Sequence, residues 1–150
     1  MSIILIELIG IIEKRCKMKL TTKSEYSILA LLYIARHEKD GYIKIEQICS
    51  KYDMPKKYLE LLFMIFRRSR YLKTKRGKSG GYKLGRPASK ITLAEIVRLM
   101  DGALAPTESV SKYFFSDTPL AQEKKVIKVF KEIRDFISKK LEGLTLADLA

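Results

Sequence analysis

The sequence predicts a mainly α-helical fold with one small β-hairpin and a long C-terminal helix. Apolar residues recur at spacings of three and four through most of the chain, which is typical of amphipathic helices. Thr-x-x-Glu sequences, which cap helix N-termini, begin at Thr22 and Thr92. One glycine-rich, basic stretch, residues 73–87 ("KTKRGKSGGYKLGRP"), interrupts the helical pattern and favours a hairpin.

Composition narrows the class of protein before any motif is considered. The 150 residues make about one domain, which excludes a large multidomain enzyme. Thirty Lys and Arg face 17 Asp and Glu, a net charge of +13. This excess predicts a polyanionic partner, nucleic acid first and an anionic membrane surface second. The apolar run at residues 3–12 is about half the ~20 residues of a spanning helix, so we expect no transmembrane segment.

Three helices are predicted at the start of the domain. The first begins at the Thr22 to Glu25 capping box and ends near Gly41. The second covers about residues 44–51, and the third runs from Lys56 to about residue 69, after a tight break at "YDMP". The residues expected to face the core are Ile28, Leu29, Leu32 and Tyr33, then Ile45, Ile48 and Cys49, then Leu59, Leu62, Phe63 and Phe66. Three helices in this order, the last two joined by a short turn, indicate a helix-turn-helix.

The glycine-rich stretch can be interpreted in two ways. Gly77, Lys78 and Ser79 match the end of a phosphate-binding loop, G-x-x-x-x-G-K-[ST]. That motif requires glycine at position 72, which is Leu72, and "GGYKLGRP" is a poor helix start. We therefore predict a hairpin with strands at about 73–75 and 82–84, in which Gly77, Gly80 and Gly81 supply residues of positive φ. A hairpin directly after a helix-turn-helix is a wing.

The C-terminal half is predicted to hold two more helices. The first has a capping box at Thr92 and Glu95, a hydrophobic staple between Ile91 and Ile96, and an end at Gly102. A polar linker covers residues 103–117. The long helix is expected to start at Thr118-Pro119 and to continue to about Leu141, followed by a tail, "LTLADLA", with one short helical turn. We divide the chain into an extension at 1–17, a DNA-binding domain at 18–102, this linker, and a dimerisation helix with its tail at 118–150.

The long helix carries a broad apolar face. Its apolar positions, at spacings of four, three and four, are Val126, Phe130, Ile133 and Ile137. Because this face lies far from the predicted N-terminal core, we expect it to pack against the same helix of a second subunit.

Most of the charge excess lies on the third helix and the hairpin. Residues 51–86 contain twelve Lys and Arg but only Asp53 and Glu60 as acids, a net charge of +10. A solvated basic surface is the alternative, but these charges coincide with the two elements that touch DNA in winged helices. Cations placed this way bind phosphates with a salt-dependent affinity.

The sequence resembles the Rrf2 family of bacterial winged helix-turn-helix transcription regulators. The likeness runs from Met18 nearly to the C-terminus, and Met18 coincides with the family's usual start, which suggests that residues 1–17 are an upstream extension or a misassigned start. The segments that carry the resemblance are "MKLTTKSEYSILALLYIA", "YLELLF", "RGKSGGYKLGRP", "ITLAEIVRLMDG" and "LTLADL".

The resemblance implies a homodimer that binds double-stranded DNA at a pseudo-palindromic operator and regulates transcription, most simply as a repressor. Tyr58 and Glu60 match recognition-helix positions, and Arg76 matches a wing arginine that approaches the minor groove. A carboxylate can accept a hydrogen bond from cytosine N4. The expected DNA-binding residues are Lys56, Lys57, Tyr58, Glu60, Arg67, Lys75, Arg76, Lys78 and Ser79.

The linker departs from the family's iron–sulfur members, which carry three cysteines there. Residues 103–117 contain no cysteine, so we expect no cluster, no other cofactor and no metal, as in the cluster-free member CymR. Cys16 and Cys49, the two cysteines of the chain, form no metal-binding spacing and fit a reducing, cytoplasmic setting.

The signal and the mode of action stay open at this point. A small molecule or a protein could act as effector, and Tyr113, Phe114 and Phe115 could line its pocket, although packing against the long helix is the simpler role. No arrangement of catalytic residues is present, so we expect no enzyme and no membrane partner. The alternative function is a module that binds an enzyme or sensor protein, with DNA binding weak or lost.

Overall fold

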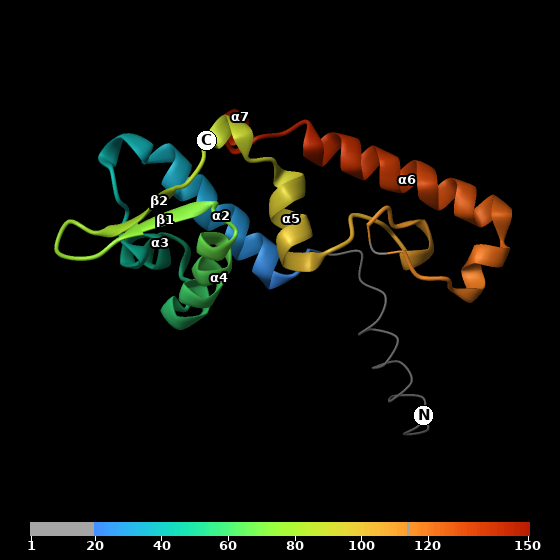
Figure 1. Cartoon of the computed structure of the whole chain (residues 1–150), viewed down its shortest axis with the longest axis horizontal. Coiled ribbons are helices and arrows are strands. Elements are labelled where there is room, and N and C mark those ends of the chain that lie inside the picture. Colours follow the sequence, from blue (N-terminus) through green and yellow to red (C-terminus); the bar gives the residue numbers. More distant parts are fainter. Residues whose placement is uncertain (1–19, 114) are drawn as a thin grey trace, which may run out of the picture.

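The computed structural model describes residues 20–113 and 115–150 and confirms the mainly helical fold with a two-stranded antiparallel sheet (Figure 1). The expectations about residues 1–17, including Cys16, and about Phe114 lie outside the described residues. No helix in the described part is long and apolar enough to cross a membrane.

The elements follow one another in the predicted order, with short 3-10 turns between them. Their bounds are α2 Thr22–Arg36, α3 Ile45–Tyr52, α4 Lys56–Arg68, β1 Leu72–Lys75, β2 Gly81–Leu84, α5 Leu93–Asp101, α6 Lys124–Glu142 and α7 Leu146–Leu149. The 3-10 turns are Glu38–Asp40, Ala88–Lys90, Glu108–Val110 and Pro119–Gln122.

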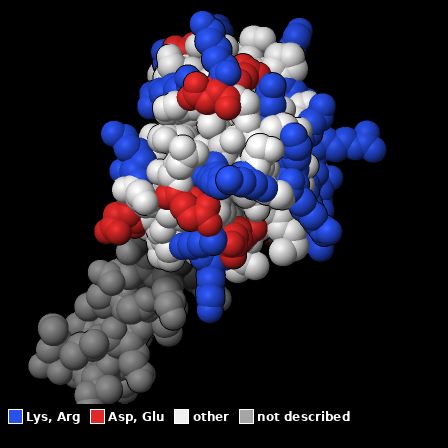
Figure 2. Space-filling model, turned by 90° about the vertical axis from the view of Figure 1, so that its left-hand side faces the viewer, with Lys and Arg blue, Asp and Glu red and all other residues white. Residues whose placement is uncertain are grey.

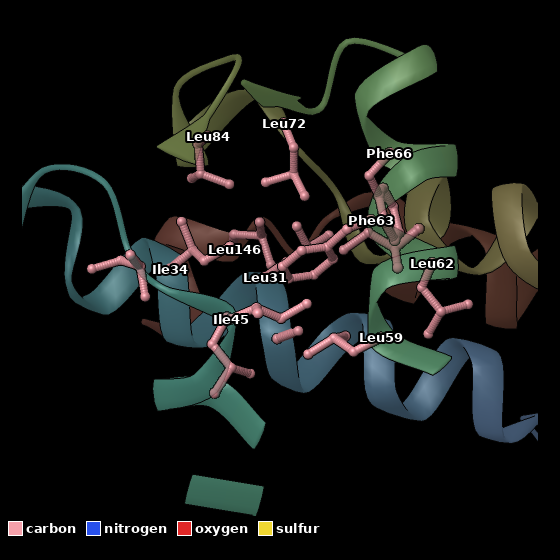
Figure 3. Packing of buried hydrophobic residues seen from close by; sticks show 14 of the residues in the cluster. Leu31, Ile34, Ile45, Leu59, Leu62, Phe63, Phe66, Leu72, Leu84 and Leu146 are labelled. Carbon is pink, nitrogen blue, oxygen red and sulfur yellow. The ribbon is translucent and has the colours of Figure 1, made fainter. Parts of the chain in front are cut away.

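The core lies between α2, α4 and the hairpin (Figure 3). The four apolar residues predicted to face inward from α4 are all buried: Leu59, Leu62, Phe63 and Phe66. The hairpin adds Leu72 and Leu84, which pair directly across the two strands. Because these side chains leave water together, the hairpin is fixed to the helices at its base while its tip stays free.

The inward face predicted for α2 is partly confirmed, because Ile28, Leu32 and Tyr33 are partly buried against the core, but it is wrong for Leu29. Leu29 is 36% exposed, whereas the fully buried apolar residues of α2 are Ala30, Leu31 and Ile34. Residues 28–35 are almost all apolar, so the hydrophobic pattern does not define a face. The buried side of α2 also carries the small residues Ser24 and Ser27, and α2 packs against α5, so tertiary packing rather than the apolar pattern decides which residues face inward.

The capping box predicted at Thr22 does not form, because Thr21 occupies the N-cap position of α2. The backbone N–H of Thr21 donates to Asp101 Oδ2 at 3.1 Å, and its hydroxyl donates to the other oxygen of the same carboxylate. A tertiary contact to the end of α5 thus replaces the local cap.

The hairpin is confirmed, and each strand begins one residue earlier than predicted, at Leu72 and at Gly81. Gly77 and Gly81 have φ of 102° and 147°, as expected, but Gly80 does not have a positive φ. Gly80 is required for space instead, because a Cβ atom there would lie 2.2 Å from the carbonyl oxygen of Lys75.

The long helix begins six residues later than predicted. Residues Pro119–Gln122 form a 3-10 turn, and α6 starts at Lys124. The linker leads away from the core and α6 brings the chain back toward it (Figure 1). Arg134 Nη1 donates to the carbonyl oxygen of Val110 at 2.8 Å, and Lys112 lies 3.5 Å from Asp135, so polar contacts hold α6 to the linker.

The tail is helical as predicted, but it packs into the core of the first domain. The N–H of Leu146 donates to the carbonyl of Ile91 at 2.9 Å, and the N–H of Leu93 donates to Leu144 at 2.9 Å. Thr145 and Asp148 form a capping box at the start of α7. The Leu146 side chain is fully buried and contributes to the same core as α2 and β2 (Figure 3). The domain boundary at residue 102 stays a prediction. The tail follows this boundary in the sequence, but it packs with the residues that precede the boundary.

We predict that Leu146→Ala lowers the free energy of unfolding by about 2 to 5 kcal/mol, because it removes a fully buried side chain from a packed core. Urea unfolding followed by circular dichroism measures the change. The matched control is Leu61→Ala, at a residue that is 56% exposed, which we expect to cost about 0.5 kcal/mol or less. Equal losses for the two variants would contradict the assignment of the tail to the core.

Candidate nucleic-acid interface

The third helix, α4, is fixed by its buried side, and this sets which residues face outward. Pro55 occupies the N-cap position, and Asp53 before it has a φ of 51°, which closes the turn after α3. With four large apolar residues held in the core, Lys57, Glu60 and Arg67 are exposed on the outer side. Tyr58 is only half-buried, and its ring packs edge-on against Tyr26 of α2, with 5.9 Å between the centroids.

Lys56 differs from the other predicted DNA-binding cations because it already has an anionic partner. Its Nζ atom lies 2.6 Å from Glu46 of α3 and 3.9 Å from Glu60. The hydrogen bond from Lys56 lowers the pKa of the Glu46 carboxyl, and the same bond raises the pKa of Lys56. Lys56 therefore joins α3 to α4, and it offers less free positive charge than Lys57 does.

The hairpin presents its tip to solvent and is anchored at its base. Residues 73–79 are all exposed, which includes Lys75, Arg76, Lys78 and Ser79. Behind them, Ile43 and Tyr82 exchange two backbone hydrogen bonds of 2.8 Å each. The Tyr82 ring also lies 4.6 Å from that of Phe63 in α4. The anchors give the free cations of the tip a defined position beside α4.

A groove separates α4 from the hairpin. Glu60 and Arg67 line it from α4, Thr74 and Tyr82 line it from the strands, and Phe63 and Met64 complete the lining. The groove holds about 500 Å³ of space between protein atoms, part of it open to solvent. Glu60 and Arg67, predicted separately from the sequence, thus face the same space.

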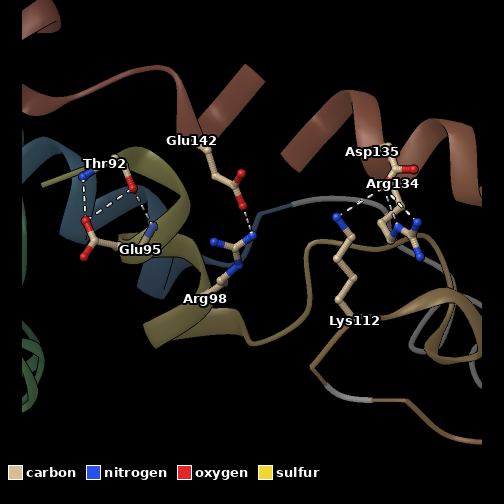
Figure 4. Close-up of polar contacts among 7 residues, drawn as sticks. All are labelled: Thr92, Glu95, Arg98, Lys112, Arg134, Asp135 and Glu142. Atoms are coloured by element: carbon tan, nitrogen blue, oxygen red, sulfur yellow. Dashed lines mark hydrogen bonds and ion pairs between the residues drawn. The ribbon is translucent and has the colours of Figure 1, made fainter. Parts of the chain in front are cut away.

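The base of the hairpin, at the end opposite its tip, is joined to α5 by a polar cluster around Glu95. The Thr92 hydroxyl accepts from the N–H of Glu95 at 3.2 Å, while Glu95 Oε2 accepts from the N–H of Thr92 at 2.9 Å, so the predicted capping box is present (Figure 4). Glu95 Oε1 lies 3.4 Å from Arg86 Nη1 and accepts from the Tyr71 hydroxyl at 3.2 Å. The Arg86 guanidinium also covers the Tyr71 ring at 3.9 Å.

Burial raises the pKa of the Tyr71 hydroxyl, so this group keeps its proton at neutral pH and can donate to Glu95. The Glu95 carboxylate therefore caps α5 and also binds Tyr71 and Arg86, the residues that flank the hairpin. The sequence predicted the cap but not this second role, because Arg86 and Tyr71 are brought to Glu95 only by the folded hairpin.

Sequence reasoning also missed the apolar residues on the outer face of α4. Leu61 is 56% exposed, and Met64 and Ile65 are each 39% exposed, among the cations of the same face. Large apolar side chains exposed beside Lys57 and Arg68 are a signal of contact with base edges, because thymine methyl groups in the major groove offer apolar contacts. The amphipathic pattern alone could not identify them, since it assigns apolar residues to the core.

Figure 2 views the molecule from the hairpin end. Lys and Arg side chains gather most densely along the right-hand side of this face, whereas most acidic side chains lie over the rest of it. Positive charge is therefore most concentrated along one side of this face, as expected for a surface that meets phosphates.

The predicted dimerisation residues lie along α6 on a side that the described chain leaves partly uncovered. Phe130, Ile133 and Ile137 are half-buried, and Val126 is 37% exposed. Phe136 beside them is 73% exposed. Among the described residues of α6, only Ser138 is buried, so one chain does not cover this apolar face.

The fold and the interface define a class: a helix-turn-helix followed by a basic hairpin is a winged-helix DNA-binding protein. A family model described as "Rrf2: Iron-dependent Transcriptional regulator" matches residues 20–150. The chain belongs to the Rrf2 family, as the sequence motifs predicted, and is a DNA-binding transcriptional regulator.

Individual relatives agree with this assignment. An HTH-type transcriptional regulator of Synechocystis is 33% identical over 132 residues, which are 88% of this chain and 87% of the relative. The structure of CymR, the global cysteine regulator of B. subtilis, has a TM-score of 0.71 at 28% identity and covers 89% of this chain and 97% of that one. IscR of T. potens has a TM-score of 0.69 at 26% identity, covering 88% and 85%.

The residues that the structure describes do not form a site that fits the iron named in the family's description. Across residues 20–113 and 115–150, no three His, Cys, Asp or Glu side chains come together as a metal-binding group. Cys49 lies on α3, and burial raises the pKa of its thiol, which opposes the thiolate form that iron–sulfur clusters require.

We predict that Glu95→Gln costs less stability than Glu95→Ala. Glutamine still accepts from the N–H of Thr92 and keeps the cap, whereas alanine loses it at a cost of about 1 kcal/mol. Both variants lose the ion pair with Arg86, which is about one-third exposed and contributes at most about 1 kcal/mol. Urea unfolding compares the two, with Glu25→Ala, at an exposed residue in the first turn of α2, as control. A glutamine variant as unstable as the alanine variant would contradict the capping role.

Proposed function

We propose that the chain is a sequence-specific transcriptional repressor that binds a pseudo-palindromic operator as a homodimer, without an iron–sulfur cluster and without enzymatic activity. It would act in the cytoplasm, where the bacterial chromosome lies. The observation that carries the proposal is the groove between α4 and the hairpin, with Glu60 and Arg67 facing it and the cationic tip beside it.

The two elements suit different parts of the duplex. The outer side of α4 offers a carboxylate and apolar side chains, which can distinguish base edges in the major groove. The tip offers Arg76 and neighbouring lysines, which suit phosphates and a narrow minor groove. Phosphate contacts from both elements would position the helix: Lys57, Tyr58 and Arg67 from α4, and Lys75, Lys78 and Ser79 from the hairpin. Lys56 would contribute less, because Glu46 already pairs with it.

We predict that Glu60→Ala and Arg76→Ala change DNA binding differently. An operator recovered by genomic footprinting is titrated by fluorescence anisotropy at several salt concentrations. Arg76→Ala weakens binding to all sequences and lowers the slope of log K against log salt by about one. Glu60→Ala reduces discrimination at one base pair by about 1 to 3 kcal/mol and leaves the slope unchanged.

The control for this experiment is Lys128→Ala, an exposed lysine on α6 outside the helix-turn-helix and the hairpin. We expect its salt slope and base preference to equal those of the unmodified chain. If Glu60→Ala and Arg76→Ala also bind like the unmodified chain, the roles given to these two residues are wrong.

The uncovered apolar face of α6 supports the dimer. A helix of 19 residues is about 28 Å long, enough for several turns of contact with a second copy. The face combines Val126, Phe130, Ile133 and Ile137 with the exposed Val129 and Phe136. A second copy offers the same apolar side chains, so the face can cover itself across a two-fold axis. Two DNA-binding units would then meet half-sites separated by about one helical turn, or about 34 Å.

We predict that Ile133→Glu converts the dimer to a monomer, because it places a charge within the apolar contact. Size-exclusion chromatography with light scattering measures the mass. Lys128→Glu, on the opposite side of α6, introduces the same residue and is expected to leave the dimer intact. A dimer that survives Ile133→Glu would show that another surface joins the subunits.

A second candidate function is supported by the aromatic residues of the linker. Tyr113 is 71% exposed and Phe115 is 64% exposed, which suits contact with an effector or a protein partner. A stoichiometric partner in a pull-down, together with no salt-dependent DNA binding, would favour a protein-interaction module over a repressor.

A further inference from the structure

Helix α4 carries apolar side chains on two opposite sides. The buried row consists of Leu59, Leu62, Phe63 and Phe66. A second row, Leu61, Met64 and Ile65, begins two residues later and repeats the first part of the same spacing. Two residues turn an α-helix by about 200°. The second row, which we call the outer row, therefore points almost directly away from the core.

The outer row forms a continuous apolar strip that is exposed to solvent. Leu61 is 56% exposed, and Met64 and Ile65 are each 39% exposed. Neighbouring large apolar side chains at a surface mark a binding site, whereas single ones are common everywhere. Met64 also lines the groove between α4 and the hairpin, together with Glu60 and Arg67. The outer row thus adjoins the space that Glu60, the proposed reader of a base, faces.

Cationic side chains stand at both ends of the outer row. Lys57 precedes Leu61 by one helical turn, Arg68 follows Met64 by another, and both cations are exposed. A rise of 1.5 Å per residue puts Lys57 and Arg68 about 16 Å apart along the helix axis. Their long side chains can therefore reach the phosphates on both edges of a major groove about 12 Å wide. The apolar row between them would then lie against the base edges.

A second copy of the chain suits this strip less well than DNA does. A two-fold contact pairs one surface with itself, so the cations beside the outer row would meet the same cations of the second copy. Like charges oppose such a contact, whereas the phosphates of DNA attract all of them. The apolar groups that the major groove offers to this row are the methyl groups of thymine.

We propose that the outer row reads thymine methyl groups, so that each operator half-site holds two neighbouring A·T pairs beside the base pair that Glu60 contacts. Leu61 and Ile65 are four residues apart, about 6 Å along the axis, which spans about two base pairs of about 3.4 Å each. This selectivity rests on the proposed binding of an operator by α4 and the hairpin, and it names bases that α4 selects.

Deoxyuridine substitution tests the proposal, because uracil lacks only the methyl group of thymine and keeps its pairing with adenine. Each thymine of an operator recovered by genomic footprinting is replaced in turn, and fluorescence anisotropy measures the affinity. We expect a loss of about fourfold at each of two neighbouring positions per half-site, which corresponds to about 0.8 kcal/mol for one apolar carbon.

The variant Leu61→Ala completes a double-mutant cycle with the methyl group. It should bind the thymine and uracil forms equally at one of the two positions, as expected for two groups in contact. More than half of the Leu61 side chain is exposed, so we expect the variant to fold normally. Phe115→Ala is the matched control, since it removes a large apolar side chain that is 64% exposed on the linker. It should keep the full sensitivity to deoxyuridine.

Several outcomes would overturn the proposal. Salt-dependent operator binding that no deoxyuridine weakens would do so, as would equal sensitivity in Leu61→Ala and the unmodified chain, and both leave operator binding itself intact. A halved particle mass of Leu61→Ala in light scattering would assign the outer row to a contact between copies instead. Absence of any salt-dependent DNA binding by the unmodified chain would overturn the proposed function, and this selectivity with it.

Discussion

Burial of the aromatic side of α4 is the constraint on which the interface depends. Phe63 and Phe66 have no exposed surface, and Phe63 also contacts Tyr82 of the hairpin. The same packing therefore sets the rotation of α4 and the position of the hairpin beside it. Rotating the helix to expose other side chains would bring large apolar groups into water, at about 1.5 to 3 kcal/mol for each side chain. The proposed DNA-binding surface thus depends on the core, and the core residue Phe63 also lines the groove beside the hairpin.

Polar contacts join α6 to α5 and to the linker, while the apolar residues of α6 are at most half-buried. Arg98 pairs with Glu142 near one end of the helix (Figure 4). Near the middle of the helix, Arg134 donates to the backbone carbonyl of Val110 in the linker. Ion pairs with one exposed partner are weak and salt-dependent. The core is therefore held by packing, whereas the contacts of α6 with α5 and the linker include ion pairs that salt weakens. In the proposed homodimer, contacts of this kind would allow the spacing of the two DNA-binding units to adjust to the duplex.

Local sequence patterns predicted the helices and strands, and contacts between residues far apart in the sequence explain the features that these patterns did not predict. The spacing of Leu59, Leu62, Phe63 and Phe66 predicted the buried side of α4 correctly because these positions follow the helical period, although Leu61, Met64 and Ile65 between them are apolar too. The uniform apolar run in α2 carried no such information, and its rotation follows from packing against α5. Thr21 rather than Thr22 became the N-cap because Asp101, 80 residues away, accepts from it. The contacts of Tyr71 and Arg86 with Glu95 were also beyond prediction, since only the folded hairpin brings these residues together.

The core of the DNA-binding unit is complete only when the C-terminal tail has been synthesised, because Leu146 of the tail is one of its members. Leu146 enters a core whose other members come from residues 30–96. A nascent chain that has been made only as far as α6 already holds the whole helix-turn-helix and the hairpin. It still lacks the Leu146 side chain of the core and the backbone partners of Ile91 and Leu93. Domains fold as units, so stable folding waits for the tail. A truncated product of translation would then be a poor competitor for operator sites, because its core is unfinished.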